Sequence, residues 1–264
     1  MLQIQTVIFD LDGTVYQNMS FHHSYLRALT AGTWAEKWQE ELCTLVETIL
    51  RGERLEMNRF YLRGEVQADT PDALAEALQK RVCPDMTYEQ AIGREDVVYL
   101  GDAWALLAFL GDGMGLLKGS RADEVYRSTR VEMEREGMEG NLRLRDAVAA
   151  LQKRKRVILL SNSYRQTVLE FLRQLGFEGV FREICPSARK PYGMLESLRA
   201  LDPELLAQPE QVLSIGDHAF NDLMPVAAIG GKTLWMNPYP GIHEPEYDWS
   251  LRTLDELAEF INRM

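Results

Sequence analysis

A short apolar run near the N-terminus, Val7-Ile8-Phe9, ends on two aspartates and a glycine, Asp10-Leu11-Asp12-Gly13. β-Branched and aromatic residues in such a run predict a buried strand. In open α/β sheets, ligands bind beyond the carboxyl ends of the strands, so this strand would carry two carboxylates to a ligand site. Close carboxylates repel each other unless a cation joins them or one takes up a proton. The stretch therefore predicts a metal site, a proton-transfer role or both, although Asp-Gly is also a common turn dipeptide.

Composition and charge narrow the class of protein. The chain has 264 residues, of which 46% are hydrophobic and 26% charged, as in ordinary globular proteins. Its formal charge of -11 argues against nucleic acid or an anionic membrane as a partner. The three cysteines are far apart and form no CxxC pair, and the first residues lack the pattern of a signal peptide. We therefore expect a cytoplasmic protein without disulfides.

The middle of the chain, from residue 20 to about 139, repeats apolar residues at three- and four-residue steps. Thr70-Pro71 is a typical helix start, because threonine caps helices and proline suits their first position. No alternation typical of strands competes with this pattern, so the region is predicted to be all-helical. The expected helices cover residues 34–50, 70–82, 97–110 and 121–136, and Gly111–Gly115 should end the third of them.

After Gly140, helices and strands alternate, which predicts a parallel, doubly wound, Rossmann-like sheet. The expected strands cover residues 157–160, 181–185, 212–215 and 232–236, and the closing helix covers 253–262. Well over a hundred residues separate the first strand from the second. Because a whole βαβ unit takes only about 30 residues, the surplus predicts an inserted module. The expected domains are an α/β core over residues 1–16 and 140–264 and a helical cap over residues 17–139.

Polar side chains follow three of the later strands. Ser161 stands where a strand turns into a helix, a place that favours anions but where serine is often only a cap. Lys190 precedes a helix that begins with Pro191; a lysine there suits an anionic ligand, although a surface lysine is the plainer interpretation. Asp217 and Asp222 follow another strand, and carboxylates of this kind suit Mg²⁺. Each pattern alone is weak, and their order is what is specific.

In that order the patterns resemble the motifs of the haloacid dehalogenase (HAD) superfamily. The residues that carry the resemblance are Asp10-Leu11-Asp12-Gly13-Thr14, the strand-terminal Ser161, Lys190-Pro191, and Gly216-Asp217 with Asn221-Asp222. The resemblance covers the predicted core from Gln3 to about Asn237, and the insertion stands at the position of the family's C1-type helical caps. It implies a hydrolase with a Rossmann-like core.

The resemblance also implies catalytic roles. Asp10 would be the nucleophile that forms an aspartyl-phosphate, and Asp12 the general acid and then the general base. Lys190 would neutralise phosphate and steady Asp10.

The same resemblance implies binding residues. Thr14, Ser161 and Asn162 would bind the phosphoryl oxygens, together with Lys190. The implied Mg²⁺ ligands are Asp10, the backbone carbonyl of Asp12, Asp217, and Asp222 as a ligand or a partner of one. The implied partner is a small phosphorylated metabolite, and the oligomeric state stays open.

Three activities compete under this resemblance. The family's dehalogenases lack an aspartate at the position of Asp12, so the resemblance favours phosphomonoester hydrolysis. A phosphosugar mutase of the β-phosphoglucomutase type is the second hypothesis, and a non-catalytic binding or regulatory module is the third. Outside the motifs, His22-His23 lies in the predicted linker, where solvation or helix packing is a commoner role than metal binding.

Overall fold

The computed structural model describes residues 4–18, 20–239 and 243–264, which fall into two compact units. The first unit comprises Met1–Gln17, Gly137–Pro238 and Glu246–Met264, and the second comprises Asn18–Glu136 and Tyr239–Pro245. The expected boundaries, after residues 16 and 139, lie one and three residues from these. Residues 239–245 were expected in the core, yet the described ones, Tyr239 and residues 243–245, group with the second unit, and residues 240–242 lie outside the described residues. One reason is that the Asn58 side chain donates to the His243 carbonyl at 2.9 Å.

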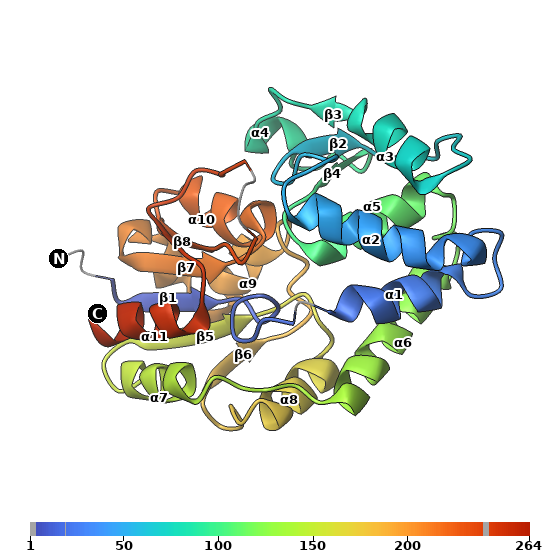
Figure 1. The fold of residues 1–264 in the computed structure, drawn as a ribbon. Coiled ribbons are helices and arrows are strands. Elements are labelled where there is room, and N and C mark those ends of the chain that lie inside the picture. Colours follow the sequence, from blue (N-terminus) through green and yellow to red (C-terminus); the bar gives the residue numbers. More distant parts are fainter. Residues whose placement is uncertain (1–3, 19, 240–242) are drawn as a thin grey trace. The chain divides into compact units, whose positions relative to one another are not determined.

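A six-stranded sheet forms the centre of the first unit, with the order β6-β5-β1-β7-β8-β9 (Figure 1). Every neighbouring pair is parallel, as the alternation of helices and strands predicted. The strands are β1 (Thr6–Phe9), β5 (Arg156–Leu160), β6 (Glu183–Cys185), β7 (Val212–Gly216), β8 (Lys232–Met236) and β9 (Trp249–Leu251). The edge strand β9 was missed, since a three-residue strand shows too little alternation to be recognised.

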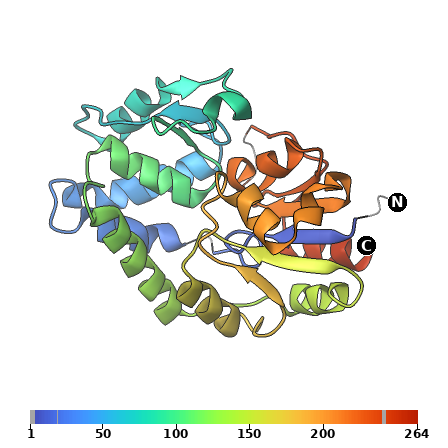
Figure 2. The same ribbon diagram turned by 180° about the vertical axis from the view of Figure 1, so that it is seen from behind.

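Helices cover both faces of this sheet. Figures 1 and 2 show α7 and α11 side by side on one face, with α9 and α10 on the other. The helices are α7 (Leu142–Leu151), α8 (Arg165–Gln174), α9 (Met194–Leu201), α10 (Met224–Ala227) and α11 (Leu254–Asn262), and α10 follows a π-helical turn, Ala219–Leu223. The α11 helix begins with a capping box between Thr253 and Glu256, which explains its sharp start.

The second unit is mostly helical, but the prediction that it is all-helical is wrong. It contains an antiparallel sheet with the order β3-β2-β4. The strands are β2 (Phe60–Leu62), β3 (Val82–Cys83) and β4 (Val97–Tyr99), and the helices are α1 (Phe21–Thr30), α2 (Gln39–Leu50), α3 (Pro71–Gln79), α4 (Tyr88–Ala91), α5 (Ala103–Gly113) and α6 (Arg121–Glu136). Strands of two or three residues are too short for a period of two to stand out, so β4 was merged with the following helix.

The core of the first unit packs against the central strands. Ile8 and Ile158 are paired across β1 and β5, and both are buried against Met194 and Leu198 of α9. Fully burying such a side chain contributes about 1.5–3 kcal/mol.

Among the described residues, no helix has the length and apolar character that crossing a membrane requires.

Truncation of Ile158 tests this packing. Ile158→Ala leaves a cavity beside β1, so we expect the free energy of unfolding to fall by about 2–5 kcal/mol. Urea denaturation of the full chain, followed by circular dichroism, measures the change. The control is Leu169→Ala in α8, whose side chain is 44% exposed and whose loss should cost less than about 0.5 kcal/mol. Equal effects of the two changes would contradict the proposed core.

Candidate active site

The candidate site lies at the carboxyl ends of the central strands. β1 pairs in register with both neighbours, since Phe9 lies opposite Leu159 of β5 and Ile215 of β7. The strands therefore end at the same level, and the residues that follow them meet at one edge of the sheet. Asp10 continues the pairing by one residue, because its N–H donates to the Ile215 carbonyl at 2.9 Å.

A buried lysine joins two aspartates at this edge. Lys190 Nζ donates to Asp10 Oδ1 and to Asp222 Oδ1, each at 2.6 Å. The side chain of Lys190 is only 3% exposed. Removing a charge from water costs several kcal/mol, and here two opposite charges compensate for that cost. The lysine is a buried counter-ion, so its interpretation as a surface lysine does not hold.

The backbone of Lys190 is fixed from the other side by Asn162. The Lys190 N–H donates to Asn162 Oδ1 at 2.6 Å, and Asn162 Nδ2 donates to the Lys190 carbonyl at 3.1 Å. These two hydrogen bonds fix the backbone of Lys190 at a point before the chain enters α9. The sequence assigned Asn162 to phosphate; in the structure its side chain positions Lys190.

The loop before Lys190 is held in an unfavourable conformation. Ser187 and Arg189 have φ values of 53° and 52°, in the left-handed region that non-glycine residues seldom adopt. Two backbone hydrogen bonds of 3.0 Å fix the loop, from Ser187 to the Ser163 carbonyl and from Ala188 to the Ser161 carbonyl. Such conformations cost about 1–3 kcal/mol each and persist only where the surroundings determine them.

The charges at the site oppose each other strongly. Burial raises the pKa of the Asp10 carboxyl to about 8; Asp222 and Asp12 act in the same direction, whereas Lys190 lowers it. Burial acts to lower the pKa of Lys190, yet its contacts with Asp10 and Asp222 raise that pKa above its ordinary value. The lysine therefore stays charged, and one cation does not fully balance the carboxylates around it.

Two glycines allow the carboxylates to approach the backbone. A Cβ atom on Gly13 would lie 2.0 Å from Asp217 Oδ2, and one on Gly216 would lie 2.3 Å from the Cβ of Asp222. Gly13 also has a φ of +75°, which favours glycine. The glycine after the first two aspartates thus does more than form a turn, since it leaves room for a carboxylate from the end of β7.

Three carboxylates form a group that suits a divalent cation. One oxygen each of Asp10, Asp217 and Asp222 lies within 4.8 Å of the others. Mg²⁺ binds oxygen ligands and accepts a few carboxylates together with water and phosphate oxygens, so this donor set fits it. The Asp12 side chain is not in the group; its expected contribution is its backbone carbonyl, which stays a prediction.

The Asp12 carboxyl is instead held by two hydroxyl groups. Tyr16 Oη donates to Asp12 Oδ1, and Ser163 Oγ donates to Asp12 Oδ2 at 3.3 Å. Tyr16 is 3% exposed, and its ring packs edge-on against Phe171 with ring centres 5.6 Å apart. Sequence reasoning missed Tyr16 and Ser163 as site residues. Their proximity to Asp12 and Ser161 in the chain was the available signal.

Two further buried hydroxyl groups, of Thr14 and Ser161, follow the ends of β1 and β5 in the chain. Thr14 is fully buried, and within the described part of the chain its Oγ1 has no hydrogen-bond partner. Burying a hydroxyl group without a hydrogen-bond partner costs free energy. A ligand that forms a hydrogen bond with Thr14 would remove that cost. Ser161 is 2% exposed and its Oγ accepts from the Ser163 N–H at 3.1 Å, which leaves its own hydrogen available to donate.

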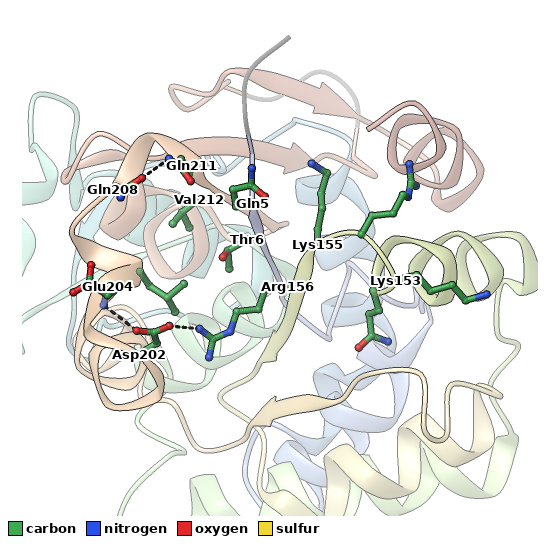
Figure 3. A pocket seen from close by; sticks show the side chains of 13 residues that line it. Gln5, Thr6, Lys153, Lys155, Arg156, Asp202, Glu204, Gln208, Gln211 and Val212 are labelled. Atoms are coloured by element: carbon green, nitrogen blue, oxygen red, sulfur yellow. Dashed lines mark hydrogen bonds and ion pairs between the residues drawn. The ribbon is translucent and has the colours of Figure 1, made fainter.

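A hollow of about 540 Å³ lies at the opposite edge of the sheet (Figure 3). It is lined by residues at the start of the strands, among them Thr6, Arg156 and Val212. Its principal cation is already paired, because Arg156 Nη1 contacts Asp202 Oδ2 at 2.7 Å and Nη2 contacts Glu183. We therefore assign the chemistry to the carboxylate edge and not to this hollow.

Comparison with known proteins adds to this geometry. The family model of haloacid dehalogenase-like hydrolases matches residues 4–230. YfnB from Bacillus subtilis, solved bound to magnesium, is 19% identical with a TM-score of 0.56, covering 98% of this chain and 99% of that chain. A HAD phosphatase from Thermococcus onnurineus is 16% identical with a TM-score of 0.51, covering 98% of both chains. A Thermotoga maritima protein assigned as a beta-phosphoglucomutase is 14% identical with a TM-score of 0.51, covering 98% of this chain and 99% of that chain. These likenesses show a shared fold, and no curated protein matches the chain.

The role of the buried lysine can be tested through stability. Lys190→Met leaves Asp10 and Asp222 buried without their counter-ion, so we expect the free energy of unfolding in EDTA to fall by about 3–5 kcal/mol. Urea denaturation measures this change.

The matched control for that experiment is Lys232→Met. Lys232 also contacts a carboxylate at 2.7 Å, that of Asp248, but the two side chains are 29% and 28% exposed. Its loss should cost less than about 1 kcal/mol. If both changes cost the same, Lys190 does not carry the buried charge as described.

Proposed function

The chain belongs to the haloacid dehalogenase-like hydrolase family, and from this premise we propose that it hydrolyses phosphomonoesters through an aspartyl-phosphate intermediate. The observation that carries the proposal is the Asp12 carboxyl, held by Tyr16 and Ser163. Displacement of a halide releases a stable anion that needs no proton. An alkoxide leaving group needs one, and a carboxyl oriented by two hydroxyl groups is suited to supply it.

Asp10 is the nucleophile in this proposal. Lys190 holds its Oδ1, so Oδ2 attacks phosphorus and the bond from phosphorus to the leaving oxygen breaks. Mg²⁺, when held by Asp10, Asp217 and Asp222, supplies positive charge that keeps the carboxylates ionised and offsets the phosphate dianion. The Lys190 ammonium adds a second fixed positive charge, which favours the ionised form of Asp10.

Asp12 moves the protons. As its acid form, it gives a proton to the leaving oxygen while the first bond breaks. As the carboxylate, it then takes a proton from the water that attacks the acyl phosphate, which releases Asp10 and inorganic phosphate. Tyr16 and Ser163 fix both of its oxygens, so the same carboxyl serves both steps without turning.

Thr14 and Ser161 bind the phosphoryl oxygens in the proposal. The Thr14 hydroxyl is buried and unpartnered in the described structure, and the Ser161 hydroxyl has a hydrogen to donate. Donors fixed before the reaction stabilise the charge that develops on the transferring group. The buried positions of both residues favour this preorganisation.

The proposed substrate is a small phosphorylated metabolite. A net charge of -11 disfavours polyanions such as nucleic acid, so the local cations must act on a compact dianion. We assign the second unit, inserted after β1, as the cap that sets which ester is accepted. The three cysteines of the whole chain are free, which fits a reducing compartment such as the cytoplasm.

Phosphate release tests the activity. We expect Mg²⁺-dependent release from at least one member of a panel of sugar phosphates, nucleoside monophosphates and p-nitrophenyl phosphate, and none in EDTA. Asp10→Asn removes the nucleophile and should lower the rate about a thousandfold or more. Isomerisation of a hexose 1-phosphate without release would establish the mutase instead. If the folded protein is inactive in both assays, the binding-module hypothesis replaces the proposal.

The contact between Tyr16 and Asp12 gives a separate prediction. Tyr16→Phe removes one hydrogen bond to the acid and base, so kcat should fall about 10- to 100-fold. The residue does not touch the phosphoryl group in this mechanism, so KM should stay within about twofold. Steady-state kinetics on the best substrate separates the two constants. Tyr88→Phe, in α4, is the control and should match the native protein; a change confined to KM in Tyr16→Phe would contradict the assignment.

A further inference from the structure

The second unit contains a cluster of two histidines and a glutamate that the proposed hydrolysis does not use. α1 and α2 are connected by a short segment that contains a single helical turn, Glu36–Trp38, and pack against each other. His22 and His23 lie in the first turn of α1, and Glu47 lies in the last turn of α2. The antiparallel pairing therefore places the glutamate opposite both imidazoles. The histidine pair is part of a helix, whereas the sequence placed it in a linker.

The distances in this cluster differ from those of hydrogen bonds. His22 Nε2 and His23 Nε2 lie 3.6 Å and 3.7 Å from the same oxygen, Oε1 of Glu47. Hydrogen bonds between nitrogen and oxygen are about 2.7–3.2 Å long. Ligand atoms about 2.0–2.1 Å from a tetrahedral ion are separated by about 3.4 Å. One atom from each of the three residues lies within 4.8 Å of the others, so the spacing is close to that of a ligand set.

The arrangement of the two imidazoles also favours a ligand role. The two rings are 4.2 Å apart, with an angle of 34° between their planes. A neutral imidazole is a good metal ligand, and a carboxylate between two of them supplies the negative charge.

The donor set selects a class of ion. Two imidazole nitrogens and one carboxylate oxygen suit Zn²⁺, Co²⁺ and Ni²⁺, whereas Mg²⁺ prefers oxygen ligands alone. The His22 side chain is 5% exposed, and those of His23 and Glu47 are 49% and 46% exposed. An ion would thus have a dry side against α1 and an accessible side that is open to water or a further ligand.

From this geometry we propose that His22, His23 and Glu47 form a binding site for a divalent transition-metal ion of the Zn²⁺ class. The ion joins the first turn of α1 to the last turn of α2. Because it binds only the folded second unit, it stabilises that unit in proportion to the logarithm of its concentration. The site is separate in residues and in donor type from the carboxylates of the first unit.

Zinc titration tests the proposal on the full chain. The protein is stripped with EDTA, dialysed into excess Mg²⁺ to occupy the carboxylate group, and titrated with Zn²⁺ by calorimetry. We expect one equivalent to bind. His23→Gln and Glu47→Gln alter exposed side chains and should each weaken binding at least about tenfold. His243→Gln, which changes another exposed histidine of the same unit, is the matched control and should bind as the native protein does.

A Co²⁺ spectrum identifies the ligands and keeps the test decisive. Nitrogen and oxygen ligation gives visible bands without the sulfur charge-transfer absorption that Cys43 on α2 would add. Circular dichroism checks that each variant is folded. The proposal is overturned if the native protein binds no Zn²⁺ in excess Mg²⁺, or if the Co²⁺ spectrum shows sulfur ligation. It is also overturned if His23→Gln and Glu47→Gln bind Zn²⁺ as tightly as the native protein, or if His243→Gln weakens binding as much as they do.

Discussion

The contact of Lys190 with Asp10 and Asp222 is the constraint around which the first unit is arranged. A parallel sheet brings carboxylates to one edge, and burial makes their repulsion severe. One buried ammonium, 2.6 Å from each of two carboxylates, offsets part of that repulsion. Burial, with smaller contributions from Asp222 and Asp12, raises the pKa of Asp10 in spite of the lysine. A site of this kind is stabilised by whatever cation and anion complete it.

The surrounding structure serves to hold that contact. Asn162 fixes the backbone of Lys190, and the strained Ser187 and Arg189 shape the loop that delivers it. Gly216 leaves space for Asp222 so that its carboxylate can reach the lysine. Strain at these positions is tolerated because strands β1, β5 and β7 are buried and in register beneath them. The stable sheet compensates for an unfavourable edge.

The sequence predicted what depends on long patterns and missed what depends on short ones. Apolar runs such as Val157–Leu160 and Val212–Ile215 indicated the parallel core, which the structure confirms. The two- and three-residue strands of the second unit carry no measurable period, so the all-helical prediction for that unit failed. The edge strand β9 has only three residues and was missed for the same reason.

Side-chain contacts that follow from the regular sheet could be predicted, whereas those that depend on loops or on helix pairing could not. Residues at strand ends, such as Ser161 and Asp217, could be placed together because parallel strands end at one edge. The contacts of Tyr16 and Ser163 with Asp12 depend on how two loops fold back, which no periodicity describes. Glu47 meets His22 and His23 only because α1 and α2 are antiparallel. Pairing between helices separated by a connection must therefore be seen before such a cluster can be recognised.

The two proposed cation sites differ in a way that makes their coexistence reasonable. Asp10, Asp217 and Asp222 offer only oxygens, whereas the cluster on α1 and α2 offers two nitrogens and one oxygen. Transition-metal ions bind most sites more tightly than Mg²⁺ does, so affinity alone would place zinc at both. Abundant Mg²⁺ and a phosphate ligand at the carboxylates would counter this, since Mg²⁺ favours oxygen ligands and phosphate. The imidazoles give scarce zinc a better alternative, and selectivity then follows from donor chemistry and supply together.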